Sequence, residues 1–191
     1  MKSSVTIGFA LCGSFCTFSL VIPIVESLVE QGYSVIPIMS NTAYNTDTRF
    51  GKAEEFAEKL CDICHTPVVH TIYDAEPFGP KKMLDALIIE PCTGNTLGKL
   101  ANGISDTPVT LAAKAHLRNH RPIIIAVSTN DALAGSAQNI GKLLATKYYY
   151  FVPMRQDDPF NKPNSIVADF SQTQKTLELA MCGTQIQPIL M

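Results

Sequence analysis

The sequence has no excess of charge of either sign. Its 15 lysine and arginine residues and 17 aspartate and glutamate residues give a net charge of −2, and the basic residues are dispersed rather than interleaved with aromatic ones. A nucleic-acid-binding surface needs a basic patch that neutralises phosphates. The composition therefore argues against nucleic acid as a partner.

The cysteines and histidines also lack the spacing of a disulfide framework and of a metal site. The six cysteines in 191 residues lack the density and spacing of a small secreted scaffold, so we expect reduced thiols in a cytoplasmic protein. Cys61, Cys64 and His65 have metal or redox spacing, but no second pair occurs and zinc needs four ligands. His116 and His120 lack the glutamate of a helical zinc motif. We predict no metal.

One stretch, from Val5 to Val25, lacks charged residues and is about long enough for a signal sequence or a membrane span. Only Lys2 precedes it, Gly13 and Ser14 interrupt it, and Pro23 lies within it, all of which suit a membrane span poorly. We interpret the stretch as a buried strand followed by a helix, and we predict no association with a membrane.

Apolar runs of strand length alternate with helical segments along the chain. The expected strands are residues 5–11, 33–39, 67–71, 86–90, 122–127 and 148–152. The expected helices are residues 15–30, 49–61, 95–118 with a break at 106–108, 131–146 and 169–182, and the segments 74–80 and 153–164 are expected to be loops. The pattern predicts one α/β domain over residues 1–191: a Rossmann-like, doubly wound parallel sheet of about six strands in a three-layer sandwich.

In such sheets, ligands bind outside the carboxyl ends of the strands. The loops expected there are residues 12–16, 40–47, 91–96, 128–131 and 153–164. In the first of them, Gly13 and Ser14 precede a helix, whose free N–H groups and dipole attract anions. The segment lacks the third glycine of a dinucleotide fingerprint and the lysine of a Walker loop. Ordinary helix capping at Ser14, and a local turn at Ser40, stay open as alternatives.

The segment from Pro91 to Asp106 carries the most specific pattern. A buried strand leads into small and hydroxylated residues that begin a helix and offer donors for a ring edge, ribityl hydroxyls or a phosphate. The segment resembles the Pro-Ala-Ser-Ala-Asn-Thr motif and the following helix of the flavoprotein family that includes the flavin-containing cysteine decarboxylases. The similarity covers most of residues 4–145.

The resemblance implies that the protein binds flavin mononucleotide (FMN). In the family, a Gly-Ser turn near the amino terminus and a Ser or Thr after the second strand also touch the flavin. The predicted FMN site consists of the residues that match these places and the polar residues of the motif: Gly13, Ser14, Ser40, Thr93, Asn95 and Thr96. Members of the family commonly form trimers or larger assemblies, which implies a homo-oligomer.

Two departures from the decarboxylases bear on the chemistry. Those enzymes carry a histidine just upstream of the fourth strand, where this sequence has residues 78–82 without one, so decarboxylation of a cysteinyl peptide is not expected. Their Pro-Ala-Met-Asn segment corresponds to residues 127–130, of which only Asn130 matches. Because that asparagine contacts a substrate carboxylate in the family, the resemblance assigns Asn130 the same contact.

The segment from Pro153 to Phe170 resembles one particular group within this flavoprotein family. It is similar to the B subunits of bacterial synthases that make pyridine-2,6-dicarboxylate (dipicolinate) together with a separate A subunit. This implies oxidation of a dihydrodipicolinate-type precursor in the mother cell of a sporulating bacterium, with an A subunit and a dicarboxylate as partners. The catalytic residues stay unknown, because no side chain is a convincing general base. The alternatives are a non-catalytic scaffold for a nicotinamide-dependent A subunit, and another flavin-pocket enzyme such as a decarboxylase.

Arg155 and Lys162, in the same segment, offer cations for a dicarboxylate. Arginine presents a planar fork of donors that matches a carboxylate, whereas lysine supplies a point charge. Asp157 and Asp158 provide an alternative, local salt bridges in a solvated loop that are worth about 0 to 1 kcal/mol. Both interpretations stay open for Arg155, and the salt bridge is favoured for Lys162. The predicted substrate-binding residues are Asn130 and Arg155.

Overall fold

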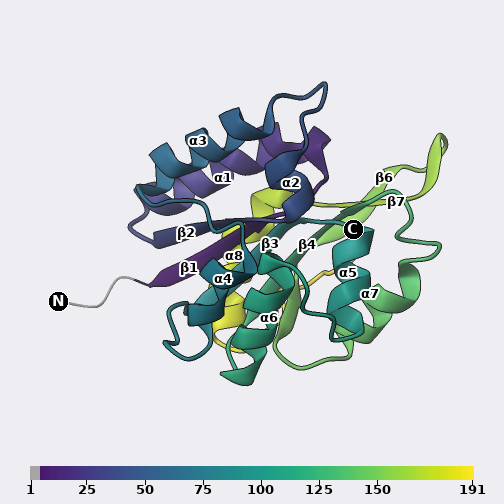
Figure 1. The fold of residues 1–191 in the computed structure, drawn as a ribbon. Coiled ribbons are helices and arrows are strands. Elements are labelled where there is room, and N and C mark those ends of the chain that lie inside the picture. Colours follow the sequence, from purple (N-terminus) through teal and green to yellow (C-terminus); the bar gives the residue numbers. More distant parts are fainter. Residues whose placement is uncertain (1–4) are drawn as a thin grey trace.

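The computed structural model describes residues 5–191, which form a seven-stranded sheet with helices on both faces (Figure 1). The strands are β1 (Thr6–Leu11), β2 (Ser34–Met39), β3 (Ala86–Cys92), β4 (Ile123–Thr129), β5 (Tyr149–Phe151), β6 (Met154–Asp158) and β7 (Lys162–Ala168). The helices are α1 (Phe18–Glu30), α2 (Asn41–Asn45), α3 (Ala53–Cys64), α4 (Ile72–Ala75), α5 (Gly94–Ala101), α6 (Pro108–Arg118), α7 (Ala137–Leu144) and α8 (Thr173–Met181). Three short 3-10 turns are η1 (Phe15–Thr17), η2 (Glu76–Phe78) and η3 (Phe170–Gln172).

The sheet is parallel except at one edge. Its order is β2-β1-β3-β4-β7-β6, with β5 pairing separately with β4. Strands β1 to β5 pair in parallel, whereas β7 is antiparallel to both β4 and β6. The amino-terminal half of β4 pairs with β5, and its last residues, Ser128 and Thr129, pair with β7. The Rossmann-like, doubly wound fold predicted from the sequence is confirmed, and its sheet is mostly rather than wholly parallel.

Each face of the sheet has its own apolar core. One core packs β-strand side chains against α4 to α7, and the other packs them against α1, α3 and α8. Figure 1 shows α1 and α3 on one side of the sheet and α5, α6 and α7 on the other. Along β1, Ile7, Phe9 and Leu11 belong to one core and Ala10 to the other. A strand buried on both faces explains why its sequence is apolar without alternation.

Two expected segments near the middle of the chain are wrong. Residues 67–71 form no strand; Val69 makes only an isolated bridge to Ile38, with its N–H donating to the Pro37 carbonyl at 2.8 Å. The expected loop at 74–80 contains the end of α4 and the turn η2. The hydroxyl of Thr71 accepts the Asp74 N–H at 3.1 Å and thereby begins α4.

The expected loop at 153–164 is also wrong, because β6 and β7 form an antiparallel hairpin there. The hairpin extends the sheet, and its turn projects from the body of the molecule in Figure 1. Most of β6 and the start of β7 are solvent-exposed, so their polar sequence carries no buried strand pattern. The parallel sheet of about six strands therefore becomes a mixed sheet of seven in residues 5–191.

Four expected helices begin later than the sequence indicated. Helices α1 and α8 start at Phe18 and Thr173, each after a 3-10 turn, rather than at residues 15 and 169. Helix α3 starts at Ala53 rather than at residue 49, because the Asp47 carboxylate accepts the Ala53 N–H at 2.9 Å. Helix α7 starts at Ala137 rather than at residue 131. Before it, the chain turns around Asp131, whose carbonyl accepts the N–H groups of Ala134 and Ser136. Residues 131–136 therefore belong to a turn at the carboxyl end of β4.

The stretch without charges divides as expected into strand β1, turn η1 and the beginning of α1. Within residues 5–191, no helix combines the length and the apolar composition that crossing a membrane requires.

Candidate functional site

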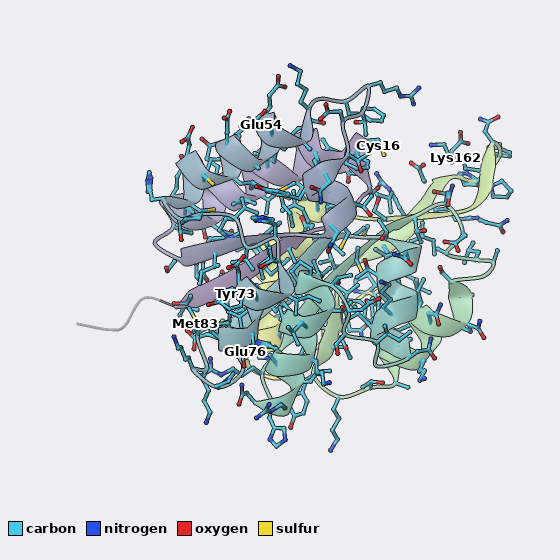
Figure 2. The ribbon with its side chains drawn as sticks, viewed as in Figure 1. Cys16, Glu54, Tyr73, Glu76, Met83 and Lys162 are labelled. Carbon is cyan, nitrogen blue, oxygen red and sulfur yellow. The ribbon has the colours of Figure 1, made fainter. Side chains whose placement is uncertain are left out.

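A large cleft opens at the carboxyl ends of the parallel strands. Its volume is about 1420 Å³, above the roughly 300 to 1,000 Å³ of an ordinary small-molecule pocket. The loops after β1, β3 and β4 form its walls together with the hairpin β6–β7 and η3. In Figure 2, Cys16 from the first of these loops and Lys162 from β7 lie in the same part of the molecule, and both line the cleft.

The cleft brings together residues that the sequence analysis placed in two separate sites. From the predicted FMN site it collects Gly13, Ser14, Thr93 and Asn95; from the predicted substrate site it collects Asn130 and Arg155. These six residues come from four segments that are far apart in the chain. Five of them meet because parallel strands share one carboxyl edge, and Arg155 joins them because β7 of its hairpin pairs with the end of β4.

The turn at Gly13 and Ser14 is held to the neighbouring loops. The Ser14 and Ser128 hydroxyls share a hydrogen bond of 2.8 Å, which ties the loop after β1 to the end of β4. A Cβ at Gly13 would lie 3.2 Å from Cγ2 of Thr42, so the absence of a side chain lets α2 approach. The Ser14 carbonyl also accepts the backbone N–H of Thr17 at 3.1 Å. The result is a closely packed turn with polar hydrogens at the cleft wall.

Helix α5 presents its amino-terminal end to the cleft. Its N-cap, Thr93, makes no side-chain capping bond, and Gly94 and Asn95 follow it in the cleft wall. The first N–H groups of a helix have no partner within the helix and attract anions. With the hydroxyl of Thr93 and the amide of Asn95, this end of α5 offers several donors to an anionic ligand.

Asp131 is a functional candidate that the sequence analysis did not single out. Its carboxylate accepts the Thr129 hydroxyl at 2.6 Å and the Ser136 hydroxyl at 2.9 and 3.0 Å, and it lines the cleft next to Asn130. Gly94 packs against this group so closely that a Cβ there would lie 2.6 Å from the carboxylate. The sequence signal was its place in the polar segment 128–131, one of the loops expected at the carboxyl ends of the strands.

The hairpin supplies one paired and one unpaired cation. Lys162 forms a 2.8 Å ion pair with Asp157, and the Asp158 carboxylate accepts the Asn161 side-chain amide at 2.7 Å. In the described chain, Arg155 forms no salt bridge. Both neighbouring carboxylates thus have other partners, and the Arg155 guanidinium at the cleft wall is available to an anion.

Two residues of the predicted FMN site lie outside the cleft lining. The buried Ser40 hydroxyl accepts the Ala43 N–H at 3.2 Å and caps α2, as in the local-turn alternative. The buried Thr96 hydroxyl donates to Cys12 Sγ at 3.3 Å and lies 3.3 Å from the Thr93 hydroxyl. Their contribution to a ligand would therefore be indirect, by fixing the turns that carry the lining residues.

Of the cysteines, Cys16 is exposed and lines the cleft, whereas Cys12 and Cys92 are buried. Burial raises the pKa of Cys12 to about 11 and that of Cys92 well above its usual value, which keeps both thiols protonated. At the end of α3, burial and the neighbouring Cys61 raise the pKa of Cys64 to about 12. All six cysteines are free thiols. No group of three or more metal-ligating side chains occurs in the part of the chain that the structure describes.

The fold and the cleft define a class: an α/β protein with a Rossmann-like sheet and a cleft lined by hydrogen-bond donors at the carboxyl edge of its parallel strands. Within that class, the chain belongs to the Flavoprotein family, whose model matches residues 1–172. It is 46% identical to the B subunit of dipicolinate synthase from Bacillus subtilis over 184 residues, which cover 96% of this chain and 92% of the relative.

Solved structures agree with this assignment. The structure of the dipicolinate synthase B subunit from Bacillus halodurans has a TM-score of 0.90 and 45% identity, and the match covers 100% of this chain and 98% of that one. The FMN-dependent cysteine decarboxylase SpaF shares the fold with a TM-score of 0.68 at 21% identity, covering 93% of this chain and 95% of that one.

Proposed function

We propose that this chain acts as the B subunit of a dipicolinate synthase, with FMN and a dicarboxylate side by side in the cleft. Together with an A subunit it would convert a dihydrodipicolinate-type precursor to pyridine-2,6-dicarboxylate in the mother cell of a sporulating bacterium. The identity of 46% to the B subunit of a dipicolinate synthase over nearly the whole chain supports the substrate class. Membership of the Flavoprotein family supports the cofactor.

The observation that carries the proposal is the composition of the cleft wall. Gly13, Ser14, Thr93 and Asn95, from the loop after β1 and the start of α5, offer neutral donors, and Arg155, from the hairpin strand β6, offers a charged donor. A volume of about 1420 Å³ is sufficient for a nucleotide and a small diacid together.

The residues present fit FMN. Polar hydrogens for the phosphate and ribityl chain come from Ser14, Thr93 and the first turn of α5, and Gly13 and Gly94 let the neighbouring protein segments pack closely behind these donors. Apolar side chains at the rim, Leu20, Ile24 and Phe50, can cover an aromatic ring. When bound, the flavin would supply hydride acceptance, and the protein would supply position and electrostatics.

Flavin uptake is the first test of the proposal. We expect the purified chain to be yellow, or to bind added FMN with quenching of flavin fluorescence in a titration. Riboflavin should bind at least tenfold more weakly, because the anion site would have no phosphate to bind. A colourless protein that takes up neither compound would refute the cofactor assignment.

The two hairpin cations provide the test of the dicarboxylate site. Arg155→Ala should weaken binding of pyridine-2,6-dicarboxylate about tenfold or more, because a charge-assisted hydrogen bond contributes roughly 1.5 to 3 kcal/mol. Lys162→Ala is the matched control and should change the affinity less than threefold, because Lys162 is already paired with Asp157. Isothermal titration calorimetry measures both. Equal effects of the two substitutions would contradict the assignment of Arg155.

The cleft offers no histidine. His65, His70, His116 and His120, which are all the histidines of the chain, lie away from its lining. The absence of a histidine from the lining favours an oxidative over a decarboxylating role. It also favours a second candidate function, a non-catalytic partner for a nicotinamide-dependent A subunit. Activity assays that combine the A subunit with either the wild-type chain or its Asn130→Ala variant decide between them. If the cleft is catalytic, Asn130→Ala should lose most of the activity. If the chain is only a scaffold, the variant should be as active as the wild type.

We also propose that the chain forms a homo-oligomer, as the resemblance to its family implies. Sedimentation of the purified chain, with and without FMN, tests this. A monomer at micromolar concentration under both conditions would contradict it.

A further inference from the structure

The Asp131 carboxylate is fixed in the cleft by neighbours rather than by a counter-ion. Both of its oxygens accept hydroxyl hydrogen bonds, at 2.6 to 3.0 Å, from Thr129 and Ser136. The buried Ser136 is itself fixed by two backbone hydrogen bonds: its N–H donates to the Asp131 carbonyl, and its carbonyl accepts the N–H of Ile140. A carboxylate held on two sides in this way keeps one orientation when a ligand arrives.

The negative charge of this carboxylate is not balanced by an ion pair. No salt bridge of residues 5–191 includes Asp131, although Arg155 and Lys162 line the same cleft. An anionic substrate would be repelled by such a group unless the group also provides an attraction. A carboxylate accepts hydrogen bonds and donates none, so the attraction must come from a donor on the ligand.

We propose that Asp131 is a specificity-determining residue that accepts a hydrogen bond from a protonated ring nitrogen. The inference rests on the proposed function, in which the ligand is a nitrogen heterocycle with carboxylates on both sides of the nitrogen. A partly reduced ring carries a proton on that nitrogen when it is in its enamine tautomer or is a protonated imine. The aromatic product instead presents a bare lone pair at neutral pH, which an acceptor cannot bind.

The position of Asp131 in the wall suits this role. It follows Asn130 directly, which the resemblance assigns to a substrate carboxylate, and Arg155 lines the same cleft with a donor for the second carboxylate. Together these residues supply the three kinds of group that the reduced ring needs: a donor for each of its two carboxylates and an acceptor for its N–H. Loss of the ring proton would turn the central contact from attraction into repulsion and favour release of the aromatic product.

Two dicarboxylates that differ in the ring nitrogen test the proposal by calorimetry, without the oxidative reaction. Piperidine-2,6-dicarboxylate has a protonated ring nitrogen at neutral pH, and pyridine-2,6-dicarboxylate has a lone pair. We expect the wild-type chain to bind the piperidine compound about tenfold or more tightly than the pyridine compound. In Asp131→Asn, whose amide can donate to a lone pair, the preference should fall at least tenfold and can reverse.

Asp157→Asn is the matched control, since it also removes a carboxylate from the cleft lining. It frees Lys162 to attract both compounds alike, so the ratio of their affinities should stay at the wild-type value. If both compounds bind and Asp131→Asn leaves the ratio unchanged, the role of Asp131 is refuted and the dicarboxylate cleft stands. If neither compound binds the wild-type chain, the dicarboxylate assignment fails, and this inference fails with it. The preference of the wild-type chain for the piperidine compound is measured without any variant. If Asp131→Asn does not fold, a wild-type chain that binds both compounds equally still refutes the role of Asp131.

Discussion

Gly94→Ala should remove binding of both FMN and the dicarboxylate, with losses of about 100-fold in each affinity. A Cβ at this position would lie 2.6 Å from Asp131 Oδ1, 2.6 Å from Ser136 Oγ and 2.9 Å from Thr129 Oγ1. Real Cβ atoms do not approach polar atoms so closely, so the first turn of α5 or the group around Asp131 must move. Each of these supplies part of the cleft wall.

The effect on folding should be much smaller than the effect on binding. Overpacking of this kind costs about 1 to 3 kcal/mol, and part of it is offset because alanine is the better helix former. We expect a fall of several degrees in the melting temperature with an unchanged far-ultraviolet circular dichroism spectrum. The combination of near-native folding and lost binding would show that Gly94 serves the cleft.

Gly98→Ala is the matched control within the same helix. Its Cβ would lie 3.5 Å from Asn139 Nδ2, an ordinary contact, and the residue lies outside the cleft lining. The change should leave both affinities unaltered and raise stability by up to about 1 kcal/mol. Should Gly94→Ala bind both ligands as the wild type does, the rigid contact between α5 and the turn at Asp131 would not exist in solution.

The parallel part of the fold was predictable because its strands are buried on both faces. The runs that became β1, β3 and β4 are apolar without alternation, and helical segments separate them, so their type and order followed from hydrophobicity alone. The hairpin β6–β7 was not predictable in this way. Its exposed strands carry charges such as Arg155 and Asp157, and long-range pairing with the end of β4 defines it.

The candidate site was predictable to the extent that it follows the strand ends. Loops named from topology alone contain Gly13, Asn95 and Asn130, which the structure places around one cleft. The environment of individual side chains was not predictable. Ser40 follows the right strand, yet its hydroxyl is used to cap α2. The hydroxyl of Ser136 fixes the orientation of the Asp131 carboxylate, and Gly94 packs against that carboxylate. No local sequence pattern reveals these contacts.

Glu90 shows the same limit inside an apolar strand. The residue lies in β3 with no exposed surface, its Oε2 accepts the Thr173 hydroxyl at 2.7 Å, and its Oε1 has no hydrogen-bond partner among residues 5–191. Burial raises the pKa of this carboxyl to about 8, against an ordinary value of 4.5, and the bond from Thr173 only partly opposes the shift. At neutral pH the folded protein therefore holds a proton that the unfolded chain has released.

Glu90→Gln should consequently change how stability depends on pH. Between pH 4.5 and 8 the wild-type chain releases a proton from Glu90 when it unfolds, so this residue lowers stability by about 1.4 kcal/mol per pH unit as the pH rises. Glutamine keeps an oxygen for the Thr173 hydroxyl and cannot ionise. We expect the variant to be more stable than the wild type at pH 8, by an amount on the order of several kcal/mol, and close to it at pH 4.5.

His116 gives the two profiles distinct shapes. Burial, assisted by the nearby Arg121, lowers the pKa of His116 from 6.5 to about 4, so this residue costs stability as the pH falls from 6.5 to 4. In the wild type the contributions of His116 and Glu90 oppose each other between pH 4.5 and 6.5, and only the decline due to Glu90 remains up to pH 8. In Glu90→Gln, stability should instead rise to pH 6.5 and then stay level.

Urea denaturation at intervals between pH 4.5 and 8 measures both profiles directly, and Glu178→Gln, an exposed carboxylate on α8, controls for the removal of one charge. That control should follow the wild-type curve within about 0.5 kcal/mol at every pH. Parallel curves for wild type and Glu90→Gln above pH 6.5 would mean that Glu90 is ionised in the folded protein. The buried carboxyl would then require a cation or a donor that the hydrogen bond from Thr173 does not supply.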